Sequence, residues 1–249
     1  MSLLRAEKIR VSEQGALILD ELSFEINEKG VYAILAKNEK AKNTLARALA
    51  GIACLDSGSI IFKDTELSQK GEGLAVKAKI GYMPNECFFY PDMTVYETLD
   101  FTARMRKTEG DKRVRQIKAA LEFVLLTEKG DALIKDLSSS EKKRLSLANA
   151  LVGNPSLLVL EEPMLGVYND DRAFISSLIS TLGEKKAVVI LTDRVGDAKR
   201  LADTVGIVSN KKMVLWETHK EIKERLSGDE DALIKTYLAF SENEGEERR

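Results

Sequence analysis

The first sixty residues combine short alternating segments with one continuous apolar run and one helical pattern. Val31–Ala36 is apolar throughout, as expected of a strand buried on both faces of a parallel sheet. Lys42–Ala50 has the pattern of a helix, and Gly51 is placed to end it. Three further segments alternate between apolar and polar residues, which predicts strands with one buried face: Leu4–Val11, Ala16–Ile26 and Ser59–Phe62.

The middle of the chain carries the three- and four-residue spacing of helices. One predicted helix begins near Ser138. There Ser138 and Glu141 match a capping box, in which each side chain bonds the other residue's backbone N–H. Asp111 is predicted to cap an earlier helix. Its apolar face consists of Val114, Ile117, Leu121, Val124 and Leu125.

The last third returns to apolar runs of strand length, at Leu157–Leu160, Val188–Leu191 and Val205–Val208, with helical segments between them. This alternation predicts a parallel sheet with right-handed crossovers. Residues 241–249 are highly charged and lack apolar periodicity, so we expect them to form a disordered tail after a single domain over residues 1–240.

Composition narrows the class of protein. The 249 residues are 44% hydrophobic and 31% charged, which suits a globular protein with a substantial core. A net charge of −2 gives no indication of a nucleic-acid partner. No apolar run approaches the length needed to cross a bilayer, and the N-terminus lacks a signal-peptide core. Cys54 and Cys87 form no metal-binding motif.

The segment Ala36–Thr44 runs from the end of the apolar strand into the predicted helix. An apolar strand, a loop and a helix bearing Lys-x-Thr are the setting of a phosphate-binding loop, and here Lys42 and Thr44 supply that pair. Both glycines that the phosphate-loop pattern requires are absent. An exposed lysine on the first turn of a surface helix is therefore an equally good interpretation of Lys42.

Further segments, taken in order with this loop, resemble the ATP-binding subunit of an ABC transporter over about residues 3–225. Leu137–Glu141 lies where the family has its LSGGQ signature, and Leu157–Pro163 resembles its Walker B strand. The other segments match the turn after the phosphate-loop helix, the glutamine loop and the stretch that follows it: Asp56–Ile60, Ile80–Asn85 and Tyr90–Leu99.

The resemblance implies an α/β fold: a P-loop NTPase-like parallel core sheet, a small antiparallel β subdomain and an α-helical subdomain at about residues 91–153. It implies a membrane-spanning transporter subunit and a second nucleotide-binding subunit as partners, with ATP and Mg²⁺ held between the two nucleotide-binding subunits. It also implies a cytoplasmic location, peripheral on the inner face of the cell membrane.

The phosphate loop departs from the family where its glycines are replaced by Ala36, Glu39 and Ala41. An alanine held in a left-handed conformation costs roughly 1–2 kcal/mol, and the Glu39 carboxylate would repel a phosphate. We therefore expect weakened ATP binding. The residues that the resemblance assigns to the nucleotide are Asn38, Lys40, Ala41, Lys42, Asn43, Thr44 and, for a partner's ATP, Ser138 and Ser140.

The metal and catalytic positions are altered as well. Glu162 matches the carboxylate that polarises the attacking water, so it is the predicted catalytic residue if the chain hydrolyses ATP. The resemblance implies that Asn43 and Glu161 replace family residues at magnesium and that Asn85 replaces the glutamine that senses the γ-phosphate; the three together predict a weak Mg²⁺ site. A solvated acidic pair at a strand end is the competing interpretation of Glu161 and Glu162. Asp193 replaces the switch histidine, and we expect it to be the N-cap of the following helix.

Three functions remain open. The chain could be a weakly or non-hydrolysing subunit that pairs with a motif-complete partner in a transport complex, which is the hypothesis we favour. It could be an active ATPase subunit of an exporter with unusual motifs. It could also be a soluble regulator or scaffold that retains only the fold. The first hypothesis, a weakly or non-hydrolysing subunit, is favoured because the residues at the phosphate, metal and switch positions are altered, whereas the predicted strands and turns are intact.

Overall fold

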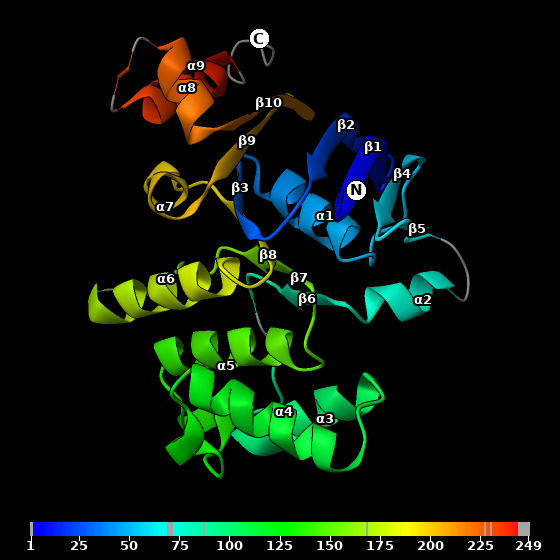
Figure 1. The fold of residues 1–249 in the computed structure, drawn as a ribbon, viewed down its shortest axis with the longest axis vertical. Helices are drawn as coiled ribbons and strands as arrows, with labels where there is room; N and C mark the ends of the chain where they lie inside the picture. Colours follow the sequence, from blue (N-terminus) through cyan, green and yellow to red (C-terminus); the bar gives the residue numbers. More distant parts are fainter. Residues whose placement is uncertain are drawn as a thin grey trace.

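The computed structural model describes residues 2–68, 72–86, 88–167, 169–226, 228–229 and 231–243. Two sheets share one helix, α1 (Glu39–Leu49), which lies between them, and a group of helices covers the opposite face of the larger sheet (Figure 1). The predicted fold class, a mixed α/β architecture with a small antiparallel sheet and a helical layer, is confirmed.

The larger sheet has the strand order β10-β9-β3-β8-β7-β6. Strands β9, β3, β8, β7 and β6 run parallel, and β10 is antiparallel to β9 at the edge. Non-consecutive neighbours require crossover connections, as the alternating pattern predicted. The strands are β3 (Gly30–Ala36), β6 (Ile80–Met83), β7 (Leu157–Glu161), β8 (Ala187–Thr192), β9 (Thr204–Ser209) and β10 (Lys212–Thr218).

Strand β3 shows why a continuous apolar run marks a central strand. Val31, Ala33 and Leu35 contribute to a core shared with the helical layer, whereas Tyr32 and Ile34 face α1 and the smaller sheet. Successive side chains of a strand point to opposite faces, so burial on both faces requires an apolar residue at every position.

The smaller sheet is antiparallel, with the order β2-β1-β4-β5. Its inner face packs on α1, and its alternating burial follows the alternating sequence pattern. The strands are β1 (Leu4–Glu13), β2 (Ala16–Ile26), β4 (Ser57–Phe62) and β5 (Thr65–Glu66).

The remaining helices lie mostly on the other face of the larger sheet (Figure 1). Helices α3, α4 and α5 contact one another, with short 3₁₀ turns at Thr127–Lys129 and Ile134–Asp136 between α4 and α5. The helices are α2 (Glu72–Lys77), α3 (Val95–Met105), α4 (Gly110–Phe123), α5 (Ser139–Leu151), α6 (Asn169–Gly183), α7 (Val195–Leu201), α8 (His219–Arg225) and α9 (Ala232–Asn243).

Two predictions for α4 are wrong. The N-cap is Glu109, not Asp111, and it makes no side-chain cap hydrogen bond. Leu125 is exposed, because the chain leaves the helix at Val124 and Leu125 takes a positive φ of 55°. Leu126 is buried in its place. A spacing pattern cannot detect this reversal of direction.

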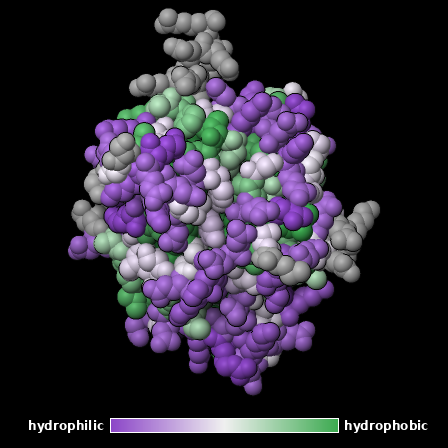
Figure 2. Space-filling model, turned by 45° about the horizontal axis from the view of Figure 1, so that its top comes forward, coloured by the Kyte–Doolittle hydropathy of each residue, from purple (hydrophilic) through white to green (hydrophobic). Residues whose placement is uncertain are grey.

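Of the predicted tail, residues 241–243 belong to α9, and residues 244–249 lie outside the described part of the chain, as does Cys87. Among the described residues, every helix is too short or too polar to pass through a bilayer. Hydrophilic residues cover most of the face seen in Figure 2.

Candidate functional site

Three neighbouring parallel strands end at the same edge of the larger sheet. β3 ends at Ala36 and leads into α1, β7 ends at Glu161, and β8, which lies between them, ends at Thr192. Ligands of open α/β sheets bind at the carboxyl ends of the strands. The fold therefore brings Lys42, on α1, to the residues that follow β7 and β8.

Lys42 and Glu162 form a buried ion pair at this edge. The Lys42 Nζ atom donates a hydrogen bond to Glu162 Oε1, and only 5% of each residue is exposed. Glu162 also accepts hydrogen bonds from the Thr192 hydroxyl at 2.8 Å and the Asp193 N–H at 3.0 Å. The competing interpretations, an exposed lysine and a solvated acidic pair, are therefore both wrong.

The backbone at Glu162 is held in an unusual conformation. Its φ of 41° lies in the left-handed region, which non-glycine residues adopt rarely. The Glu162 N–H donates to the Leu191 carbonyl oxygen at 2.9 Å, and its own carbonyl accepts from Leu165 N–H at 3.1 Å. Both ends of the residue are thus fixed, and the side chain is aimed at Lys42.

Asp193 does not cap the following helix, so that prediction is wrong. Helix α7 begins at Val195 with Arg194 as its N-cap, and the Arg194 side chain makes no cap hydrogen bond. The Asp193 carboxylate instead lies 3.7 Å from Lys42 Nζ, with about half of its side chain exposed. Lys42 therefore faces two carboxylates, one buried and one at the surface.

Glu161 lies beside this pair and accepts hydrogen bonds at both oxygens. The Tyr82 hydroxyl donates to Oε1 at 2.5 Å, and the Asn85 N–H reaches Oε2 at 3.4 Å. With its amide oriented to satisfy its neighbours, Asn43 donates to Glu161 Oε2 and to the Glu39 carbonyl oxygen, each at 3.2 Å. Burial raises the pKa of Glu161 above its ordinary value, opposed in part by the hydrogen bonds from Tyr82 and Asn85.

The phosphate-loop segment is helical from Glu39, three residues before the predicted start at Lys42. Asn38 is the N-cap: its side-chain oxygen accepts from the Ala41 N–H at 3.0 Å, and its carbonyl accepts from the Lys42 N–H at 3.1 Å. Lys40 is exposed on the first turn.

None of Ala36, Glu39 and Ala41 has a positive φ. The left-handed strain expected of the replaced glycines is therefore absent, because the segment forms helix where the glycine pattern would form an open loop.

The other predicted nucleotide residues lie in two separate places. Thr44 is buried on α1, and its hydroxyl donates to Glu13 at 2.9 Å. Ser138 is the N-cap of α5 and forms the predicted capping box with Glu141. The Ser140 hydroxyl is buried without a hydrogen-bond partner among the described residues. α5 belongs to the helical layer and α1 lies between the sheets, so the chain does not bring these serines to Lys42 (Figure 1).

Two site residues were missed by the sequence analysis. Thr192 donates to Glu162 and accepts from the Arg194 N–H at 3.1 Å, and Tyr82 donates to Glu161. Thr192 is the last residue of an apolar run, so its position at a strand end was an available signal. Tyr82 lies within a short apolar strand, where nothing in the pattern separates it from a core residue.

An exposed apolar surface lies beside the start of α3. Tyr90 and Phe101 are 70% and 54% exposed, and with Pro91, Asp92 and Met93 they line a pocket of about 460 Å³. Large exposed aromatic residues grouped in this way mark interaction sites. Tyr90, Pro91, Asp92 and Met93 belong to the Tyr90–Leu99 stretch of the family resemblance, and Phe101 follows that stretch on α3.

Comparisons with known proteins agree with this architecture. The family model for ABC transporters matches residues 19–165. The linearmycin resistance ATP-binding protein LnrL of Bacillus subtilis is 28% identical over 228 residues, covering 91% of this chain and 73% of that protein. The Nod factor export ATP-binding protein I of Paraburkholderia xenovorans is 29% identical over 209 residues, covering 84% and 68%.

Solved structures show the same fold at lower identity. An ATP-binding subunit of an ABC transporter has a TM-score of 0.84 at 18% identity, covering 96% of this chain and 100% of that chain. The protein cbiO1 from Clostridium perfringens, part of the ABC transporter complex cbiONQ, has a TM-score of 0.78 at 23% identity, covering 100% and 99%. Since the family model covers more than half of the chain, this protein belongs to the ABC transporter family, as an ATP-binding subunit of a transport system.

Proposed function

We propose that this subunit has an impaired nucleotide site and acts in its transport complex as a weakly or non-hydrolysing partner of a second, motif-complete nucleotide-binding subunit. The observation that carries the proposal is the buried pair between Lys42 and Glu162. The lysine that would bind phosphate and the carboxylate that would activate water neutralise each other, so ATP must displace Glu162 before it can use Lys42.

The backbone around Lys42 supports the same conclusion. A phosphate loop binds through free N–H groups of its backbone. Here the N–H groups of Ala41 and Lys42 donate to Asn38, within the first turn of α1. ATP would have to unwind this turn before those N–H groups became available, and Glu39 and Asp193 add negative charge nearby. Both effects weaken ATP binding.

The residues beside Glu161 do not fit magnesium in this arrangement. Mg²⁺ requires oxygen ligands in near-octahedral geometry. Glu161 accepts from the Tyr82 hydroxyl at one oxygen and from the Asn85 N–H at the other. Donors from Tyr82 and Asn85 thus already bond both oxygens of Glu161, and a cation would have to compete with them.

The second half of a shared site is less altered. Ser138 keeps its hydroxyl and caps the N-terminus of a 13-residue helix, whose dipole favours an anion. The Ser140 hydroxyl is without a partner among the described residues. This helix end is therefore suited to contact ATP held by the partner subunit, which supports a heteromeric pair over a pair of two impaired sites.

The exposed aromatic surface at Tyr90 and Phe101 supports contact with the membrane-spanning subunit. A scaffold that works without a transporter has no need of such a surface. The proposal places the chain in the cytoplasm, on the inner face of the membrane, held there by that subunit.

Calorimetric titration of the isolated protein with Mg-ATP, combined with a phosphate-release assay, tests the impaired site. We expect a Kd weaker than about 1 mM, corresponding to about −4 kcal/mol, and no phosphate release. Micromolar binding with turnover that Glu162→Gln abolishes would establish the alternative, an active ATPase. Co-purification of a membrane-spanning protein and a motif-complete ATPase tests the partner assignment, and purification without either contradicts it.

A further inference from the structure

A pocket of about 370 Å³ lies at the opposite edge of the larger sheet from Lys42. Lys29 directly precedes β3, Ser156 precedes β7 and Lys186 precedes β8, so the pocket lies at the amino ends of the three strands whose carboxyl ends hold Lys42 and Glu162. Its volume is within the range of small-molecule sites. No segment of the ABC transporter resemblance accounts for it.

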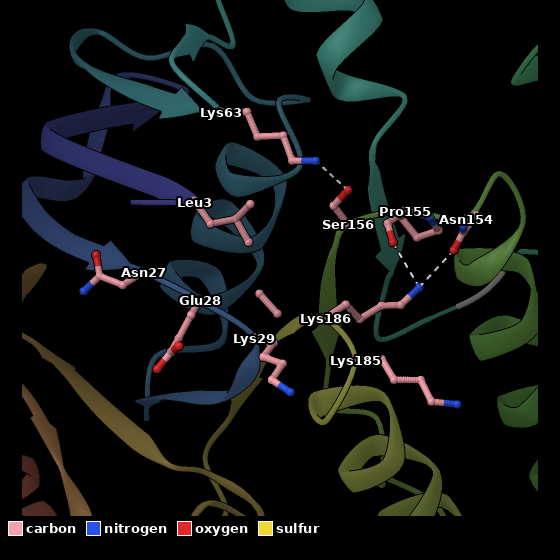
Figure 3. Close-up of a pocket in the computed structure, with 11 residues that line it drawn as sticks. Leu3, Asn27, Glu28, Lys29, Lys63, Asn154, Pro155, Ser156, Lys185 and Lys186 are labelled. Atoms are coloured by element: carbon pink, nitrogen blue, oxygen red, sulfur yellow. Dashed lines mark hydrogen bonds between the residues drawn. The ribbon is translucent and has the colours of Figure 1, made fainter. Parts of the chain in front are cut away.

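Lysines dominate the lining of this pocket. Lys29, Lys63, Lys185 and Lys186 contribute to it, against Glu28 as the one carboxylate. Figure 3 shows the Lys63 and Lys186 ammonium groups directed at the Asn154–Ser156 turn, whereas the Glu28 side chain points away from both. In a chain of net charge −2, this is a local excess of positive charge.

Among the described residues, the hydrogen-bond partners of Lys63 and Lys186 are neutral. Lys63 donates to the Ser156 hydroxyl at 2.8 Å, and Lys186 donates to the Pro155 carbonyl at 3.0 Å and the Asn154 side chain at 3.4 Å. Within the described ranges, none of the four lysines lining the pocket forms an ion pair. Their charges are therefore left without a compensating anion.

Burial disfavours the charged form of Lys186. Burial, and then the neighbouring Lys185 ammonium, lower the pKa of Lys186 below its ordinary value. A bound anion would remove both effects, since it replaces lost water contacts and offsets the repulsion between the two lysines.

An adjoining pocket extends the positive surface. This pocket, of about 430 Å³, shares Asn154, Lys185 and Lys186 with the first and adds Lys112 and Arg115 from α4. Neither of these two residues forms an ion pair within the described ranges. The positive field thus continues along one face, which favours a ligand with several negative charges over a singly charged ion.

We propose that the Lys29–Lys63–Lys185–Lys186 pocket binds a small oxyanion carrying two or more negative charges, of the phosphate or polycarboxylate class. The ammonium groups of Lys63 and Lys186 contact the anion, and the Ser156 hydroxyl and Asn154 amide supply further donors. The site is separate from Lys42 and Glu162, because the two lie at opposite ends of the same strands.

Calorimetry on the intact protein, with inorganic pyrophosphate and citrate as probes and no magnesium present, tests the proposal. The variant Lys29→Gln/Lys63→Gln removes two exposed charges from the lining. The matched control is Lys8→Gln/Lys220→Gln, which makes the same change in charge at exposed positions outside the pocket. Both variants are first checked for unchanged thermal unfolding.

Binding of either probe with a Kd below about 1 mM is expected in the wild type, weakened about tenfold or more by the pocket variant and little by the control. Binding of both probes indicates recognition of charge alone, and binding of pyrophosphate alone identifies the phosphate class. If neither probe binds, or if the two variants weaken binding equally, the proposal is overturned. Unchanged pyrophosphate binding in the pocket variant would assign that anion to another site and would equally overturn it.

Discussion

Two oppositely charged side chains are buried against each other at the end of β7 and β8. Removing Lys42 and Glu162 from water is costly, and their mutual attraction offsets part of that cost. The hydrogen bonds from Thr192 and Asp193 fix the geometry of the carboxylate. At the residue scale, the proposed function makes this pair a link between the stability of the protein and its affinity for nucleotide.

Replacing Lys42 with methionine is expected to lower the free energy of unfolding by about 3–5 kcal/mol, because Glu162 is left as a buried, uncompensated charge. The double variant Lys42→Met/Glu162→Gln should recover part of this loss, since neither site is then charged. Urea unfolding followed by circular dichroism measures both. A loss of less than about 1 kcal/mol for the single variant, as for a surface pair, would contradict the buried pair.

Glu161 gives a pH-dependent prediction. Burial raises its folded-state pKa above the ordinary value of 4.5, so the folded state disfavours the ionised form. Below pH 4.5 this loss of stability is absent, because the carboxyl group is protonated in both states. The loss develops as the pH rises from 4.5 through the folded-state pKa, and above that pKa it is constant. Glu161→Gln cannot ionise, so its stability relative to wild type should increase over that interval. A difference in unfolding free energy that is independent of pH between pH 4 and 8 would refute this assignment.

At the scale of elements, the start of α1 decides whether the phosphate loop can form. Restoring the glycines with Ala36→Gly/Glu39→Gly/Ala41→Gly should weaken the first helical turn by about 1 kcal/mol for each helical glycine and free the N–H groups now bonded to Asn38. It also removes the Glu39 charge. We expect ATP affinity to rise by about tenfold or more, measured with a fluorescent ATP analogue.

The control for this experiment is Lys40→Gly, which places one glycine in the same turn at a position where the family pattern has none. It should loosen the turn without increasing ATP affinity. If this control binds ATP as well as the triple variant does, helix stability alone limits binding, and the specific role assigned to the glycine positions is wrong.

Helix α5 offers a second prediction at this scale. Ser138→Ala removes the hydroxyl that accepts the Glu141 N–H, so it should lower stability by about 1 kcal/mol. Ser139→Ala, one residue further along and exposed, is the matched control and should change stability little. Thermal unfolding of the two variants separates these effects. Equal losses would mean that Ser138 does not act as the cap.

At the scale of the whole molecule, the exposed aromatic surface is expected to hold the subunit on its membrane partner. Tyr90→Asp should abolish co-purification with the membrane-spanning subunit and leave stability nearly unchanged, because Tyr90 is 70% exposed. Leu238→Asp, a similar change at an exposed position on α9, should keep the complex intact. If the complex survives Tyr90→Asp but dissociates with Leu238→Asp, the membrane-spanning subunit contacts the surface that carries Leu238 instead.

Much of the architecture was predictable because it depends on local patterns. The continuous apolar run at Val31–Ala36 predicted a central strand, and the spacing at Ser138 and Glu141 predicted a capping box. Errors occurred where a single backbone angle decides the outcome. Leu125 turns outward through a positive φ, and Asp193 lies one residue before the true N-cap of α7. Neither the residue type nor the periodicity contains that information.

The sequence by itself determined the order of strands and helices, the missing glycines and the position of each charged residue along the chain. Only the tertiary structure decided which charges meet. Lys42 and Glu162 are 120 residues apart, and they pair because β3, β8 and β7 run side by side and end at the same edge. Hydrophobic patterning fixes which segments are buried, whereas pairing of buried charges depends on strand register and on a left-handed turn at Glu162, which are properties of the assembled sheet.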